Sequence, residues 1–188
     1  MTLISVIIPC YNSSKTLRNT LDSIVQQDCT CDFEVIVSDD NSDDIDKIKL
    51  ILHDYQNKFK TLILIESNEN LGGGAARNKA IDIATGSYIA FLDSDDLWYK
   101  DKISTQINLY KSGSILTSRV HKGKSLDAAK VLPDIVKNEA EPISDALFIS
   151  NKLIQTSTFF MESSIAKLVK FNSDLPRHQD YDFLLRAE

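Results

Sequence analysis

Apolar residues occur along the first two-thirds of the chain in short runs of two alternating kinds. Runs with the length and β-branched composition of buried strands cover residues 3–10, 33–37, 61–65, 88–92 and 114–117. The segments between them have apolar residues at helical spacing, such as Leu17, Leu21 and Ile24 in the first segment. Buried strands that alternate with amphipathic helices predict an α/β domain with a mostly parallel central sheet covered by helices on both faces.

The pattern weakens in the remaining third of the chain. Residues 121–124 are typical of a turn, and residues 128–136 are compatible with a short helix. Residues 155–161 regain strand character, and the last helix is predicted to start near residue 175. No Gly, Asn or Pro ends that helix before Glu188, so we expect the chain to be truncated there.

Composition and charge narrow the class of protein. The chain has 188 residues, enough for one domain with a full hydrophobic core. Its formal net charge of -6 argues against an electrostatic grip on nucleic acid. Cys10, Cys29 and Cys31 contain no C-x-x-C pair, so we expect neither a disulfide framework nor a zinc site, as in a reducing cytosol. The first apolar run stops at Pro9 with no basic region before it, so we expect neither a signal peptide nor a membrane-spanning helix.

The strongest chemical signal is an acidic motif that follows one of the strands. The strand over residues 88–92 runs directly into Asp93, Ser94, Asp95 and Asp96. Carboxylates this close repel one another and raise each other's pKa values, and a divalent cation among their oxygens relieves the repulsion. Mg²⁺ and Mn²⁺ prefer such oxygen ligands and complete their coordination with water and substrate phosphates. The alternative is a solvated acidic turn that ends the strand.

Polar and charged residues follow several of the predicted strands. In parallel α/β sheets, ligands bind beyond the carboxyl ends of the strands. The residues at such strand ends, or at the helix start that follows one, are Asn12, Asp39, Asp40, Arg77 and the acidic motif. We therefore predict that these residues converge on one rim of the sheet and form a single site.

Several segments, in order, resemble a known family. They are Ser-Val-Ile-Ile-Pro-Cys-Tyr-Asn at residues 5–12, Val-Ser-Asp-Asp-Asn-Ser at 37–42, Gly-Ala-Ala-Arg-Asn at 74–78 and Phe-Leu-Asp-Ser-Asp-Asp at 91–96. His-Gln-Asp-Tyr-Asp-Phe at residues 178–183 extends the match. Together they resemble a family 2 glycosyltransferase, a class of inverting enzymes with the glycosyltransferase-A fold, a single Rossmann-like domain. Each motif is weak alone, and the order of four gives the resemblance its strength.

The resemblance implies roles for the nucleotide side of the site. The family aspartate that matches Asp39 hydrogen-bonds the uracil ring of a UDP-sugar, a bond that suits a carboxylate and an imide N–H. An Asx-turn or a helix cap is the structural alternative for Asp39, and Asp40 is the better candidate for the cap. Pro9, Tyr11 and Asn12 resemble the family's nucleotide-side loop.

The resemblance also assigns the diphosphate and the metal. Arg77 matches a family arginine that approaches the diphosphate near a helix N-terminus, and the alternative is an ion pair with Asp39 or Asp93. Asp93 is matched to the ribose and Asp95 to a Mn²⁺ or Mg²⁺ ion. Ser94 stands between them in the donor-binding loop.

Asp180 matches the catalytic base of the family. The family usually has Glu-Asp here, whereas this chain has Gln179 before the aspartate. A neutral neighbour removes one like charge, so Asp180 is expected to stay ionised more readily than in a Glu-Asp pair. The base would take the proton of an acceptor hydroxyl as that oxygen attacks the anomeric carbon from the face opposite UDP, with inversion.

The resemblance further implies a donor, an acceptor and a place in the cell. The donor would be a UDP-sugar, and the acceptor a hydroxyl of a glycan or of a lipid-linked molecule in bacterial surface polysaccharide synthesis. Residues 1–119 would form the nucleotide-sugar-binding half and residues 120–188 the acceptor-side half. We expect a cytoplasmic protein, and a lipid-linked acceptor would be compatible with peripheral association at the inner membrane.

Two other classes stay open on the sequence. A haloacid-dehalogenase-like phosphatase also carries Asp-x-Asp after an apolar strand and binds Mg²⁺. Its motif stands on the first strand with a threonine soon after, and this chain has neither feature. A non-catalytic relative would bind a nucleotide-sugar without turnover, and the presence of Asp180 argues against it.

Overall fold

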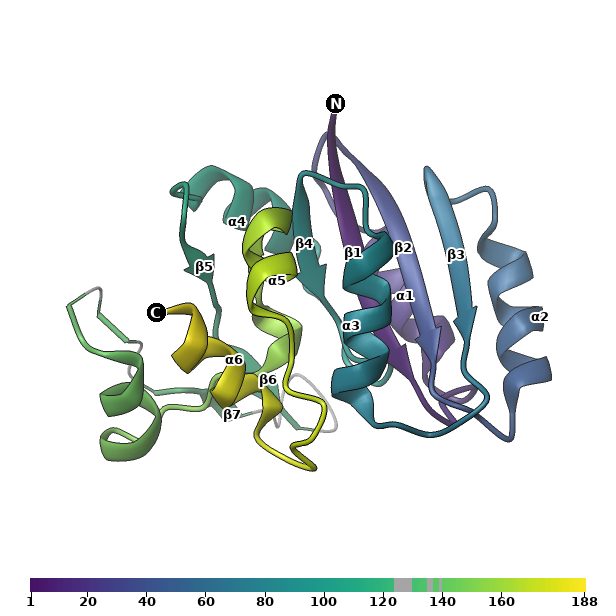
Figure 1. Cartoon of the computed structure of the whole chain (residues 1–188). Coiled ribbons are helices and arrows are strands. Elements are labelled where there is room, and N and C mark those ends of the chain that lie inside the picture. Colours follow the sequence, from purple (N-terminus) through teal and green to yellow (C-terminus); the bar gives the residue numbers. More distant parts are fainter. Residues whose placement is uncertain (124–129, 135–136, 139) are drawn as a thin grey trace.

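The computed structural model describes residues 1–123, 130–134, 137–138 and 140–188. Its centre is a six-stranded sheet with the strand order β3-β2-β1-β4-β8-β5 (Figure 1). Four neighbouring strands are parallel, namely β1 (Thr2–Cys10), β2 (Cys31–Asp39), β3 (Thr61–Glu66) and β4 (Tyr88–Phe91). The predicted α/β domain with a mostly parallel sheet is confirmed.

Two short strands extend the sheet beyond β4. β8 (Phe160–Glu162) runs antiparallel both to β4 and to β5 (Ile115–Leu116). The strand predicted over residues 155–161 is therefore only partly right, because its first part is a 3₁₀ turn, η3 (Thr156–Thr158). Since β8 runs antiparallel to β4, this turn lies beside the carboxyl end of β4, where the acidic motif begins.

Helices cover both faces of the sheet (Figure 1). They are α1 (Leu17–Val25), α2 (Ile45–Tyr55), α3 (Gly73–Ile83), α4 (Lys102–Leu109), the π-helix η2 (Asp145–Ile149), α5 (Ser163–Val169) and α6 (Gln179–Ala187). Residues of α1, α2 and α4 belong to the apolar core on one face, and residues of α3, α5 and α6 belong to the core on the other. No helix in the described part of the chain is long and apolar enough to cross a membrane.

Alternate residues of β1 pack into the two cores on opposite faces of the sheet. Ile4 and Val6 are buried in the first core, whereas Ile7 is buried in the second, as the two-residue period of a strand requires. In the second core, Phe171 stacks on Phe183 of α6 with ring centroids 4.6 Å apart. α6 is therefore tied into the main body of the domain by aromatic packing.

Two predictions for the segment after residue 120 are wrong. The predicted turn and the predicted short helix contain instead the strands β6 (Val120–Lys122) and β7 (Lys130–Leu132), which pair as a separate antiparallel sheet. Residues 124, 128–129 and 135–136 of these predictions lie outside the described part of the chain. The strands obtain their backbone partners from across the hairpin, and a local pattern cannot show such pairing.

The last helix starts later than predicted. α6 begins at Gln179 instead of near residue 175. Pro176 disfavours a helical conformation at the residue before it, and His178 has a left-handed φ of 58°. Asp180 therefore stands in the first turn of α6.

The cysteines also depart from the expectation. Cys29 and Cys31 are joined by a disulfide, whereas Cys10 is free and buried. The expected absence of disulfide bonding is therefore wrong for this pair. The two Cα atoms are 5.4 Å apart, which is within the range that a disulfide spans. The C-x-x-C pattern has two residues between its cysteines, whereas Cys29 and Cys31 are separated by one, so a search for that pattern does not detect this pair.

Candidate active site

One cavity of about 500 Å³ lies at the carboxyl ends of β1 and β4, beside the first turn of α3. Among the residues that line it are Pro9, Tyr11, Asn12, Arg77, Asp93, Ser94 and Asp95. The sheet register explains this convergence, because Ile7 of β1 lies opposite Phe91 of β4 and the next residues of both strands reach the same rim. Of the predicted site residues, Asp39 and Asp180 are not part of the lining.

Asp39 and Asp40 hold two loops at this rim. Asp39 is buried, and its Oδ2 accepts a hydrogen bond from the N–H of Ser42 (2.9 Å), three residues further on, whereas an Asx-turn joins residues two apart. Its Oδ1 is buried and has no hydrogen-bond partner in the described part of the chain. Asp40 accepts from the N–H groups of Leu71 (2.9 Å) and Gly72 (2.7 Å). Asp40 therefore fixes the loop before α3 and is not the cap of α2, whose N-cap residue is Asp44. The Asp39 bond is local, but it is neither an Asx-turn nor a cap of α2.

Asn12 connects the loops after β1 and β2. It has a left-handed φ of 52°, which asparagine tolerates better than most residues. Its N–H donates to Ser42 Oγ (2.8 Å), and its Oδ1 accepts from the N–H of Asp43 (2.8 Å). The preceding residue, Tyr11, is 52% exposed and lines the cavity. Tyr11 is thus a surface residue of the site and not a core residue.

Arg77 lies in the cavity wall with its side chain largely buried. Its Nη2 forms an ion pair with Asp93 Oδ1, and its guanidinium lies 5.3 Å from the ring centroid of Phe171. Its Nε is buried without a hydrogen-bond partner among the described residues. A Cβ at Gly73 would stand only 3.0 Å from Nη1, so the glycine leaves room for the guanidinium. Arg77 therefore forms the ion pair that was the alternative to a binding role, and it also lines the cavity.

Asp95 is the free carboxylate of the acidic loop, which we define as residues 93–98. It is exposed, lines the cavity and has no hydrogen bond or ion pair with the described residues. Its neighbour Ser94 is buried, with its Oγ 2.7 Å from Ser13 Oγ. In the described part of the chain, no group of three or more His, Cys, Asp or Glu side chains could hold a metal by itself. If a cation binds here, this loop would supply the Asp95 carboxylate, and most of the remaining ligands would come from a substrate diphosphate and water.

Asp96 and Trp98 turn into the protein. Burial raises the pKa of Asp96, a hydrogen bond from Ser157 opposes this rise, and the charges of Asp93 and Asp95 add to it. Trp98 is buried in the first core and is not part of the cavity lining. Trp98 is therefore a core residue.

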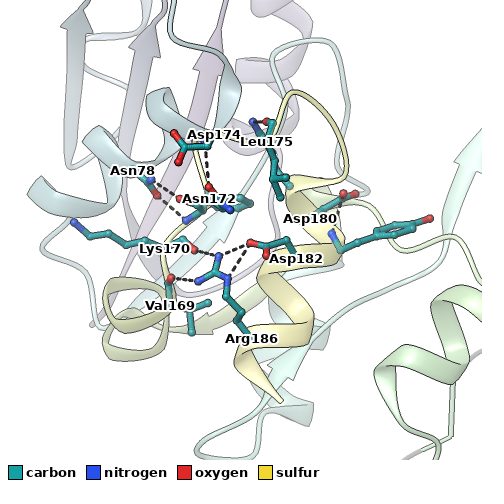
Figure 2. A network of polar contacts seen from close by, with 12 residues as sticks. Asn78, Val169, Lys170, Asn172, Asp174, Leu175, Asp180, Asp182 and Arg186 are labelled. Carbon is teal, nitrogen blue, oxygen red and sulfur yellow. Dashed lines mark hydrogen bonds and ion pairs between the residues drawn. The ribbon is translucent and has the colours of Figure 1, made fainter.

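Asp180 comes from a different element, the first turn of α6 (Figure 2). Its Oδ1 accepts a hydrogen bond from the N–H of Tyr181 (3.0 Å). Burial raises the pKa of Asp180, while hydrogen bonds from backbone N–H groups and the charges of Arg77 and His178 oppose the rise. The charge of Arg77, a residue of the cavity wall, therefore reaches Asp180.

The start of α6 packs against α3. A Cβ at Gly74 would stand 2.9 Å from the side chain of Gln179, so this glycine permits the approach. Asn78, one turn further along α3, binds both backbone groups of Phe171. Its Nδ2 donates to the carbonyl (2.8 Å) and its Oδ1 accepts from the N–H (2.8 Å). These contacts bring Asp180 toward the α3 side of the cavity.

Arg186 fastens α6 to α5 (Figure 2). It forms an i,i+4 ion pair with Asp182. Its guanidinium also donates to the carbonyls of Val169 (2.5 Å) and Lys170 (2.7 Å), at the end of α5. The sequence did not predict these two bonds, because they join residues that only the tertiary fold brings together.

The lining also contains a cation that sequence reasoning missed. Lys15 is exposed and lines the cavity. It follows Asn12 by three residues in the loop after β1. Its place after a strand end was the signal that could have found it.

The fold and the cavity define an α/β domain of the glycosyltransferase-A type. The chain belongs to glycosyl transferase family 2, whose family model matches residues 5–167. The amylovoran biosynthesis glycosyltransferase AmsB of Erwinia amylovora is 36% identical over 191 residues, which cover 98% of this chain and 63% of that protein. The glucosyltransferase WfaP of Escherichia coli is 41% identical over 120 residues, which cover 63% of this chain and 45% of that protein. The chain therefore spans less than two-thirds of the length of these relatives.

A solved structure agrees with this assignment. The domain matches Staphylococcus aureus TarS (residues 1–349, in complex with UDP) with a TM-score of 0.75 and 26% sequence identity, over 100% of this chain and 55% of that chain. The family match excludes the haloacid-dehalogenase-like phosphatase as the class of this protein. The acidic motif follows β4 and not the first strand, in agreement with that exclusion.

Proposed function

We propose that this chain is the catalytic part of an inverting glycosyltransferase that moves a sugar from a UDP-sugar to a hydroxyl group. One observation carries the proposal. Apart from Asp39, the predicted donor and metal residues come from three separate segments of the sequence and line one cavity, close to the helix that bears Asp180. Membership of glycosyl transferase family 2 supports the reaction class.

The cavity suits a nucleoside diphosphate. A uracil ring that passes the cavity lining would meet the buried, unpartnered Oδ1 of Asp39 with its N–H, and the exposed Tyr11 can flank the ring. Arg77 and Lys15 supply positive charge for the diphosphate. α3 begins beside them without a side-chain cap, which leaves its first N–H groups available to an anion. TarS was solved with UDP and with UDP-GlcNAc, which supports a uridine nucleotide as the donor here.

Asp95 would hold Mn²⁺ or Mg²⁺, with Asp93 beside it on the ribose side. The exposed and unpaired carboxylate of Asp95 fits a cation that shares phosphate oxygens with the donor. When bound, such a cation would stabilise the negative charge of the departing diphosphate. Arg77, which also lines the cavity, would act on the same charge.

Asp180 is the proposed general base. Its carboxylate takes the proton of the acceptor hydroxyl while the hydroxyl oxygen forms a bond to the anomeric carbon. The bond from that carbon to the UDP oxygen breaks in the same displacement, and the proton ends on Asp180. Attack from the face opposite UDP inverts the configuration of the sugar. Asn78 and Arg186 hold α6 in place for this step through the turn that precedes it.

The two halves of the chain would serve different substrates. All residues that line the cavity fall within residues 1–119, which supports this half as the nucleotide-sugar site. Residues 120–188 supply Asp180 and would meet the acceptor. The name of WfaP describes transfer to a sugar on diphosphoundecaprenol, which supports a lipid-linked acceptor for this chain. Such an acceptor would bring the enzyme to the cytoplasmic face of the membrane during polysaccharide synthesis.

Turnover tests the proposal. The chain is incubated with Mn²⁺, a panel of UDP-sugars and saccharides linked to diphosphoundecaprenol, and the release of UDP and the anomer of the product are measured. We expect acceptor-dependent release for one donor, with an inverted product, and its loss in Asp180→Asn. Asp174→Asn is the matched control, because it neutralises an exposed carboxylate in the turn before α6. Binding of UDP-sugars without release from any pair would favour the non-catalytic relative, and a retained configuration would contradict the mechanism.

A further inference from the structure

One buried serine joins the two ends of the acidic loop. The N–H of Asp93 donates to Ser157 Oγ (3.0 Å), and that hydroxyl donates to Asp96 Oδ2 (2.6 Å). Ser157 is only 7% exposed, and it lies 61 residues from Asp96 in sequence. A single side chain therefore holds the first and the last aspartate of the motif.

The same residue makes a third contact with the loop. The Ser157 carbonyl accepts a hydrogen bond from Trp98 Nε1 (3.0 Å). Ser157 belongs to η3, which is separated from β8 by one residue, Phe159. Because β8 pairs with β4 in the central sheet, the support under the acidic loop is connected directly to the sheet.

α1 supports the loop from a different direction. Thr20 Oγ1 lies 3.0 Å from the carbonyl oxygen of Ser94 and 3.0 Å from that of Asp96. Every residue next to Asp95 is therefore bound to a neighbouring element, while Asp95 itself has no partner in the described part of the chain. This arrangement leaves one free carboxylate on a loop whose backbone is held on both sides.

We propose that Ser157 is a positioning residue that aims the Asp95 carboxylate at the donor–metal complex. The inference rests on the proposed function, because it requires Asp95 to bind a cation together with UDP. A loop that is ordered before binding loses less conformational entropy when the ligand arrives, so affinity increases without a new contact. Ser157 would thereby link the acceptor-side half of the chain to the metal-binding loop of the nucleotide half.

Calorimetric titration of UDP in Mn²⁺ and in EDTA tests this role. Ser157→Ala removes two hydrogen bonds, and we expect UDP affinity in Mn²⁺ to fall about tenfold, the effect of one or two net hydrogen bonds. In EDTA we expect its affinity to match that of the parent. Thr158→Val is the matched control, because the Thr158 hydroxyl is also buried in η3 but bonds only to the carbonyl of Gln155. This variant should bind UDP like the parent in both buffers.

A double variant separates positioning from general damage. If Ser157 acts through Asp95, Ser157→Ala should cost no further affinity in an Asp95→Asn background. The inference is overturned if Ser157→Ala binds UDP like the parent in Mn²⁺, or if Thr158→Val loses as much UDP affinity as Ser157→Ala. It is also overturned if the affinity losses of Ser157→Ala and Asp95→Asn add in the double variant. A parent chain that binds UDP equally in Mn²⁺ and EDTA would instead overturn the proposed metal role, and the inference with it.

Discussion

Asp39 divides its carboxylate between two tasks. Oδ2 holds the turn at Ser42, and Oδ1 has no partner among the described residues. Asp39→Asn keeps an oxygen for the turn and places an NH₂ group where the uracil N–H would donate. We predict that this variant binds UDP about tenfold more weakly in EDTA, because the lost bond involves a charged acceptor.

The same titration in Mn²⁺ checks that the base contact is separate from the metal. The gain in affinity on adding Mn²⁺ should equal that of the parent. If Asp39→Asn binds UDP as tightly as the parent, the residue serves only the turn at Ser42.

We expect the ionisation of Asp180 to determine how sugar transfer changes with pH in the acidic range. Burial raises the pKa of this carboxyl above the ordinary value, and the base works only when it is ionised. Sugar transfer should therefore rise with pH through the folded-state pKa of Asp180. This rise should occur at a higher pH than for an ordinary aspartate, whose pKa is about 3.9. We predict that Asp180→Asn lowers transfer by about 10²- to 10⁴-fold and abolishes this rise. A pH profile of kcat/KM measures both effects, and a variant with the parental acidic limb would assign the limb to another group.

The residues that sequence reasoning found share one property. Arg77 and Asp95 are recognisable because their chemical type and their place after a strand are both visible in a short segment. Ser157 and Arg186 are not recognisable in this way, since each acts on partners that lie far away in sequence or in another helix. No local sequence pattern identifies a serine or an arginine that has such a role.

Gly86 marks a close contact between two elements. A Cβ there would stand 2.7 Å from the backbone N of Ser5 and 2.9 Å from the carbonyl oxygen of Leu3. Backbone atoms in the central strand cannot move aside, so we predict that Gly86→Ala lowers the free energy of unfolding by about 2–3 kcal/mol.

Chemical denaturation measures this loss against a matched glycine. Gly113 has a φ of 80°, and a Cβ added there would meet no atom within 4 Å, so Gly113→Ala should cost only the backbone strain of about 1 kcal/mol. Equal losses in the two variants would contradict the account of Gly86 as a site of close packing.

Elements with a strong local period were predictable, and elements set by pairing were not. The four parallel strands and the helices between them follow from buried runs and helical spacing. β6 and β7 depend on each other across a hairpin, and η3 depends on its position beside β4. The start of α6 depends on a left-handed φ at His178, which residue type alone does not reveal.

The net charge of the whole molecule has the same sign as the charge of its proposed ligand. Its formal net charge is -6, and UDP is an anion. Binding must therefore rely on local positive charge, of which the cavity wall offers Arg77 and Lys15. Arg77 is already paired with Asp93. A divalent cation at Asp95 would supply the missing charge, so metal dependence of UDP binding is the central claim.

Calorimetric titration of UDP into the parent chain, Asp95→Asn and Asp96→Asn, each in Mn²⁺ and in EDTA, tests this claim most directly. We predict that Mn²⁺ tightens binding to the parent at least about tenfold, as expected for a carboxylate-bound cation that shares phosphate oxygens. Asp95→Asn should lose this gain, whereas Asp96→Asn, which keeps an oxygen for the Ser157 hydroxyl, should retain most of it. Equal UDP affinity of the parent in both buffers, or an Asp95→Asn variant with the full Mn²⁺ effect, would contradict the account.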